Sequence, residues 1–247
     1  MHATAGPRSR GRLAALLVLT LLVAACGGAA GPGDSRAVTF ESSDGVRLAG
    51  RVFGDGSRAV ILTHMRSADQ RSWFDFADRL ADQGYLVLAF DFRGTCPGGD
   101  GGCSEGETVV SDLWKDVVGA IRFLRSEEAV GRVALVGASV GGTASLVAAA
   151  QPGTDVSAVV TLSAPTEIEG LRVDGTMLSS ITAGKLFVAG VGDAPAATAA
   201  QTLYEQAPPP KRVEIVPADD HGTDLLSGAQ AEVVRRLIEV ALETNRL

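Results

Sequence analysis

The pentapeptide Gly137-Ala138-Ser139-Val140-Gly141 lies between two apolar segments of different character. The segment before it, 133–136, is a short apolar run that predicts a buried strand, whereas residues 143–150 are mostly Ala, Leu and Val and predict a helix. A strand that turns sharply into a helix at a serine exposes the hydroxyl at a tight corner, and the flanking glycines permit the close backbone packing that this corner needs. The pattern therefore predicts that Ser139 is a nucleophile.

Apolar runs and helical periodicities alternate along most of the chain. The first two strands flank Ser43-Asp44-Gly45, which is typical of a hairpin. Strands and helices then alternate six times, which predicts an α/β fold with a mostly parallel sheet of about eight strands and helices on both faces. Residues 167–182 have no clear partner strand, so any lid segment is small. We expect strands over residues 38–42, 46–52, 59–64, 85–90, 132–136, 156–162, 186–189 and 213–216, and helices over residues 72–83, 109–125, 139–150, 194–206 and 228–244.

The N-terminal segment differs from the rest of the chain. Arg8, Arg10 and Arg12 precede the run Leu13–Ala25, which is apolar apart from one threonine. A run of this length is too short to span a bilayer but fits the hydrophobic region of a secretory signal. We therefore expect residues 1–25 to be a signal peptide and the mature protein to lie on the extracytoplasmic side of the membrane.

The apolar run ends in Val23-Ala24-Ala25-Cys26-Gly27-Gly28, which resembles the lipobox of bacterial lipoproteins. In that family a peptidase cuts before the cysteine, which is lipidated and becomes the new N-terminus. The resemblance implies that Cys26 carries acyl chains that anchor the protein in the cell membrane. Residues 26–36 are then the lipidated cysteine and a flexible tether, and residues 37–247 are one folded domain. The alternative is an ordinary signal peptide with a chance cysteine.

Two further cysteines, Cys96 and Cys103, flank a short segment that is mostly glycine. Export exposes thiols to oxidising conditions, so we expect a disulfide that closes this loop. The alternatives are two free thiols or a weak metal site. Because no histidine lies near in the sequence, we expect no metal.

Charge and composition exclude several classes of function. The formal net charge is −7, and there is no basic patch with interleaved aromatic residues, so we expect no nucleic-acid partner. A dinucleotide site would need G-x-G-x-x-G after the first strand, and Gly54-Asp55-Gly56 is too isolated to serve. We expect no cofactor.

From about residue 37 to its end, the chain resembles the α/β-hydrolase family. The resemblance rests on the Gly137–Gly141 elbow, on His64-Met65 after the third expected strand, and on Asp91-Phe92-Arg93-Gly94 after the fourth. Many members have glycine where this chain has Met65, which is a departure from the family's pattern. Asp193 and His221 each follow a later strand, so the three residues come in the family's order Ser, Asp, His.

The resemblance implies a triad of Ser139, Asp193 and His221. A serine hydroxyl needs a base that titrates near neutral pH, and the predicted mature chain contains two histidines, His64 and His221. We interpret His64 as a turn-stabilising residue beside the site and His221 as the base.

The acid that orients the imidazole has several candidates in the sequence. Asp193 is favoured because it follows a strand and can reach the same edge of the sheet, and an acid within residues 166–174 is held in reserve. Asp219 and Asp220 adjoin His221 in sequence, and this adjacency does not let a carboxylate reach the ring well. Asp91 and Arg93 are expected to form a structural ion pair near the site.

Backbone N–H groups of Met65 and Val140 are the expected oxyanion-hole donors.

Two functions are compatible with these residues. The first is a lipid-anchored serine hydrolase that acts on a small-molecule ester, or on a related thioester or amide. The second is a catalytically inactive binding or scaffolding lipoprotein on the same fold.

Overall fold

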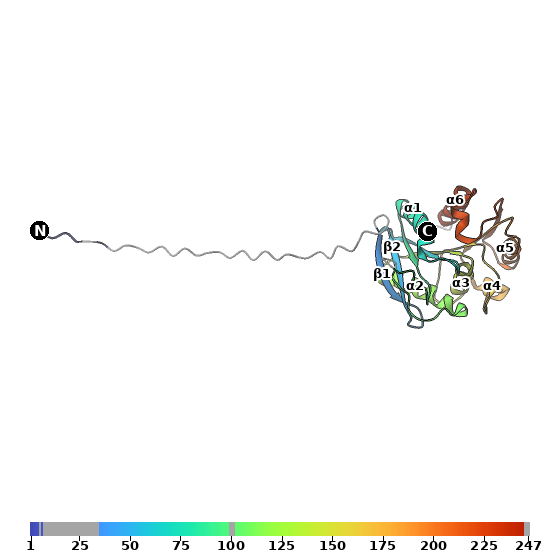
Figure 1. The fold of residues 1–247 in the computed structure, drawn as a ribbon, viewed down its shortest axis with the longest axis horizontal. Helices are drawn as coiled ribbons and strands as arrows, with labels where there is room; N and C mark the ends of the chain where they lie inside the picture. The colour runs from blue at the N-terminus through green and yellow to red at the C-terminus, as the bar shows by residue number, and fades with distance from the viewer. Residues whose placement is uncertain (5, 7–34, 99–101, 245–247) are drawn as a thin grey trace.

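The computed structural model describes residues 1–4, 6, 35–98 and 102–244 (Figure 1). Cys26, its tether up to residue 34 and nearly all of the predicted signal peptide lie outside these residues. An eight-stranded sheet runs through the centre in the order β1-β2-β4-β3-β5-β6-β9-β10. Its strands are β1 (Ser35–Glu41), β2 (Arg47–Phe53), β3 (Arg58–Thr63), β4 (Tyr85–Phe90), β5 (Arg132–Ala138), β6 (Ala158–Leu162), β9 (Gly184–Gly190) and β10 (Lys211–Val216).

The pairing in the sheet is mostly parallel. β1 and β2 form the expected antiparallel hairpin, and β2 is antiparallel to β4, whereas every other neighbouring pair is parallel. The α/β-hydrolase fold with about eight strands is therefore confirmed. Because β1 runs in the same direction as the parallel strands, its first residue, Ser35, lies on the side from which those strands start.

Helices cover both faces of the sheet because each strand presents apolar side chains to both sides. In β5, Val133 and Leu135 pack on one face, and Ala134 and Val136 pack on the other. Five helices supply the covering layers: α2 (Leu113–Glu127), α3 (Val140–Ala149) and α5 (Ala194–Gln206) pack on the first face, and α1 (Phe74–Asp82) and α6 (Ala231–Thr244) pack on the second (Figure 1).

Residues 167–182, which show no pattern of their own in the sequence, contain a small second sheet. β7 (Glu167–Ile168) and β8 (Leu171–Arg172) form a hairpin, and the short helix α4 (Gly175–Ser180) follows. Asp174 caps α4 by accepting a hydrogen bond of 3.0 Å from the backbone N–H of Met177. The excursion between β6 and β9 is thus short, as expected for the small segment predicted there.

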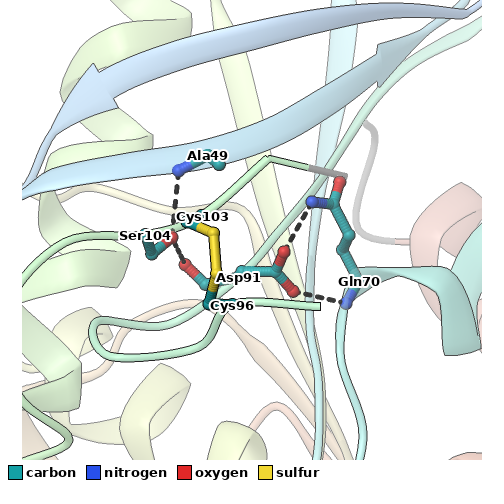
Figure 2. The surroundings of a disulfide bond; sticks show 6 residues. All are labelled: Ala49, Gln70, Asp91, Cys96, Cys103 and Ser104. Carbon is teal, nitrogen blue, oxygen red and sulfur yellow. Dashed lines mark hydrogen bonds between the residues drawn. A yellow bond between two sulfur atoms is a disulfide. The ribbon is translucent and has the colours of Figure 1, made fainter. Parts of the chain in front are cut away.

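The loop after β4 is closed by a disulfide between Cys96 and Cys103 (Figure 2). Ser104 follows the disulfide and joins the loop to the sheet, since its hydroxyl donates to the carbonyl of Asp91 and accepts from the N–H of Ala49. The loop therefore covers the sheet beside the hairpin of β1 and β2.

The expected ion pair between Asp91 and Arg93 is wrong. The Asp91 carboxylate instead accepts hydrogen bonds from the backbone and side-chain amides of Gln70, at 2.8 and 2.7 Å (Figure 2). Burial raises the pKa of Asp91 to about 6, although the two hydrogen bonds favour the charged form. The buried Arg93 guanidinium pairs with Asp116 at 2.6 Å and with Asp44 at 2.7 Å, so it ties α2 to the opening hairpin.

Candidate active site

Ser139 stands at a strained corner between β5 and α3. Its φ of 50° is left-handed, a conformation that costs a non-glycine residue of order 1–3 kcal/mol. The corner is held by a hydrogen bond of 2.8 Å from the N–H of Ser139 to the carbonyl of Leu162 on β6. A Cβ atom at Gly137 would lie 2.6 Å from the backbone of Gly141, so the bend needs glycine at this position. The hydroxyl of Ser139 is thereby presented at the carboxyl edge of the sheet.

The structure brings together the three side chains for which a triad was predicted. The Nε2 atom of His221 lies 2.8 Å from Oγ of Ser139, and its Nδ1 atom lies 2.5 Å from Oδ2 of Asp193. With the proton of the neutral ring on Nδ1, the ring donates to Asp193 and accepts the hydroxyl proton of Ser139. The carboxylate is mostly buried, with 15% of its side chain exposed, whereas 45% of the imidazole is exposed. The imidazole is therefore open to solvent, whereas the carboxylate behind it is largely shielded from water.

The start of α5 explains why Asp193 is available to His221. Asp193 is the N-cap residue of α5, yet its side chain makes no capping hydrogen bond. N-cap side chains usually accept from the second or third residue of a helix, and the second residue here is Pro195, which has no N–H. Pro195 thus removes one of the two usual capping donors, and the carboxylate bonds the imidazole instead of the helix.

The other acids considered from sequence lie elsewhere. The Asp219 carboxylate packs so closely on Gly192 that a Cβ atom there would overlap its Oδ1 atom, and Asp220 packs in the same way on Gly228. Asp174, in the reserve stretch, is occupied at the N-terminus of α4. Among these acids, Asp193 is the one that bonds the imidazole.

The backbone N–H groups of Met65 and Val140 are the oxyanion-hole donors predicted from sequence. Val140 is the first residue of α3, where the N–H has no partner within the helix. Gly141 lets the start of α3 approach the loop after β3, since a Cβ atom there would lie 2.6 Å from the carbonyl oxygens of Thr63 and His64. Within the described residues, no hydrogen bond engages the N–H of Met65 or of Val140. Both are available to an oxyanion.

His64 holds the loop that carries Met65. Its Nδ1 atom lies 2.8 Å from the carbonyl of Met65, and its Nε2 atom accepts a hydrogen bond of 3.1 Å from the N–H of Phe92. Burial lowers the pKa of His64, so the ring is neutral and donates through Nδ1. Met65 is not among the described residues with positive φ, which explains why this loop does not need the family's glycine. His64 is a structural residue of the turn, as interpreted from sequence.

Sequence reasoning missed an ion pair at the carboxyl edge of the sheet. Arg66, in the loop after β3, lies 2.6 Å from Glu169 at the turn of the β7–β8 hairpin. In the sheet, β5 lies between β3 and β6, and the hairpin follows β6, so this contact joins the segments on either side of Ser139. Both side chains are half exposed, and such pairs contribute little stability. No local pattern links residues so far apart in sequence.

The described residues were compared with the requirements of a metal site and of a membrane-spanning helix. In the part of the chain that the structure describes, no three His, Cys, Asp or Glu side chains gather where they could hold a metal ion. Within the same ranges, every helix is too short or too polar to cross a bilayer.

Comparison with known proteins gives a family and a fold. The model of the family described as serine aminopeptidase, S33, matches residues 55–215, a range that includes Ser139 and Asp193 and ends before His221. A solved esterase from Pyrococcus furiosus is 19% identical, with a TM-score of 0.72 over 85% of this chain and 90% of the esterase chain. A dienelactone hydrolase from Anabaena variabilis is 22% identical, with a TM-score of 0.69 over 85% of this chain and 97% of its own. No curated protein matches the chain.

Proposed function

The chain belongs to the serine aminopeptidase S33 family of α/β hydrolases, and on this basis we propose that it is a serine hydrolase that cleaves carboxylic esters through an acyl-enzyme. The single observation that carries the proposal is the chain of two hydrogen bonds from Ser139 through His221 to Asp193. A serine, an imidazole and a buried carboxylate in this order are the arrangement that turns an inert alcohol into a nucleophile.

The proposed reaction has two halves. Oγ of Ser139 attacks the carbonyl carbon of the ester while its proton passes to Nε2 of His221. The backbone N–H groups of Met65 and Val140 stabilise the oxyanion, and the tetrahedral intermediate collapses when the leaving alkoxide takes the proton from His221. Water then attacks the acyl-enzyme and gives a proton to Nε2 of His221, the bond between Oγ and the acyl carbon breaks, and His221 returns the proton to Oγ as the carboxylic acid leaves. Asp193 holds the ring and stabilises its positive form in both halves.

The ester is preferred over other acyl compounds because the similar solved structures include esterases from two organisms, Pyrococcus furiosus and Rhodothermus marinus. The name of the family refers to aminopeptidases, so cleavage of an amide bond is the second candidate reaction. A catalytically inactive scaffold on the same fold is the competing function.

A fluorophosphonate probe tests the proposal directly. We expect the folded protein to be labelled once, at Ser139, with the site located by mass spectrometry of the digested protein. Heat-denatured protein is the control, since labelling must require the folded site. Turnover of nitrophenyl esters but not of aminoacyl nitroanilides supports the esterase, and the reverse supports the peptidase. Folded protein that takes up no probe and turns over neither substrate would be the scaffold.

The proposed location is the extracytoplasmic side of the cell membrane, with Cys26 lipidated. Two or three acyl chains suffice for stable anchoring, at about 0.8 kcal/mol per buried methylene group. We expect full-length protein expressed in a bacterium to incorporate an alkyne-bearing palmitate analogue and to sediment with membranes. Cys26→Ala should lose both properties, whereas a Cys96→Ala, Cys103→Ala double variant should keep them. Incorporation that persists in Cys26→Ala would contradict the lipid anchor.

A further inference from the structure

We propose that Ser163 is a positioning residue that fixes the catalytic base, His221, by holding the backbone of the next residue. The inference rests on the proposed function. Ser163 follows β6, and its Oγ atom accepts a hydrogen bond of 3.1 Å from the N–H of Gly222. Both residues are buried.

Ser163 repeats the geometry of Ser139 on the neighbouring strand. Its φ is 55°, against 50° for Ser139. Its N–H donates to the carbonyl of Val188 on β9 at 2.8 Å, just as the N–H of Ser139 donates to Leu162 on β6 at 2.8 Å. Two adjacent strands are therefore each followed by a serine with a positive φ whose N–H bonds the next strand. The Ser139 hydroxyl bonds the ring of His221, and the Ser163 hydroxyl accepts from the N–H of the next residue, Gly222.

The backbone at Ser163 would suit glycine better than serine. Left-handed φ values are rare for residues with a side chain, and strain of this kind persists where the surrounding structure has a use for it. Apart from the hydroxyl, the side chain of serine offers nothing that would offset the strain. The hydrogen bond to Gly222 is the contact that this hydroxyl makes with the catalytic loop.

His221 needs such an anchor because packing does not hold its ring. With 45% of its side chain exposed, the imidazole is directed by its two hydrogen bonds and by the backbone on which it stands. That backbone is confined at Gly222, where a Cβ atom would lie 2.8 Å from Sδ of Met65 and 3.5 Å from Ala138. Together with the Ser163 hydroxyl, contacts from the loop after β3, from the end of β5 and from the residue after β6 thus hold the backbone beside His221.

The experiment compares three variants by steady-state kinetics on a nitrophenyl ester and by thermal unfolding. Ser163→Ala removes the hydroxyl and keeps the strain, whereas Ser163→Gly removes the hydroxyl and relieves it. Ser157→Ala is the matched control, because this hydroxyl donates to the carbonyl of Val133 at the opposite end of β6. We expect kcat to fall about 10- to 100-fold in both Ser163 variants, with KM within 2-fold of wild type, since misplacement of catalytic groups by about 1 Å has effects of this size.

The Ser163→Gly variant distinguishes an effect on activity from an effect on stability. We expect its Tm to equal or exceed that of Ser163→Ala while its kcat stays low, and the rate of fluorophosphonate labelling to fall in parallel with kcat. Ser157→Ala should keep the kcat of wild type. A Ser163→Gly variant with wild-type kcat overturns the inference, and so does a loss confined to KM or a loss that follows the fraction of unfolded protein. Failure of the proposed function is a different result, in which Ser139→Ala itself retains activity.

Discussion

Alanine at Ser139 is expected to abolish turnover, with kcat/KM reduced about 10⁴-fold or more and fluorophosphonate labelling lost. In the proposed reaction the hydroxyl oxygen forms the acyl bond, and no other hydroxyl contacts Nε2 of His221 within the described residues. His221→Ala should lower kcat/KM by a similar factor, because an alcohol with no base beside it is a weak nucleophile at neutral pH. Initial rates on a nitrophenyl ester measure both losses.

The double variant distinguishes a shared mechanism from two separate effects. Residues that act as one unit are not additive, so Ser139→Ala with His221→Ala should be no slower than either single variant. Ser179→Ala is the matched control, because its hydroxyl donates to the Gly175 carbonyl within α4 and should be dispensable. Full activity in folded Ser139→Ala would refute the triad.

Asparagine at Asp193 is expected to lower kcat about 10³- to 10⁴-fold with a small change in KM. The amide of asparagine can donate to Nδ1 of His221, which moves the ring proton to Nε2. A ring protonated at Nε2 cannot accept the proton of Ser139, and the positive ring loses its carboxylate. The geometry stays almost unchanged because the two side chains have the same shape. Kinetics and thermal unfolding of the same preparation separate this effect from misfolding.

Asp174→Asn is the control for Asp193→Asn, because Asp174 is the acid in the stretch held in reserve. It caps α4, and asparagine is an equally good N-cap, so both Tm and kcat should stay near wild type. Were Asp174→Asn to lose activity and Asp193→Asn to keep it, the acid would have to be reassigned.

Local patterns were enough to predict the fold and the strand ends that carry Ser139, Asp193 and His221. Ser139 directly follows β5, Asp193 and His221 lie in the loops after β9 and β10, and in a parallel sheet the carboxyl ends of all strands lie at one edge. Their convergence could therefore be expected from sequence, since it depends on strand direction and not on side-chain detail. The bounds of α3 differ by one residue at each end, because Ser139 adopts the left-handed turn and is not part of the helix.

The contacts that escaped prediction depend on which way a side chain points once the chain is folded. Arg93 and Asp91 are two residues apart after β4, yet Arg93 pairs with Asp116 on α2. The strands β7 and β8 contain two residues each, which is too short for any periodicity to be visible. The salt bridge of Arg66 with Glu169 joins loops brought together by the sheet order alone.

The direction of β1 has a consequence for a protein held at a bilayer by its N-terminus. The chain joins the sheet at Ser35, on the side from which the parallel strands start, whereas Ser139 lies at the edge where they end. If the protein is anchored through its N-terminus as proposed, the point of attachment and the proposed active site lie at opposite edges of the sheet. Attachment at Ser35 therefore does not by itself hold Ser139 against the lipid surface, and esters in solution can reach it.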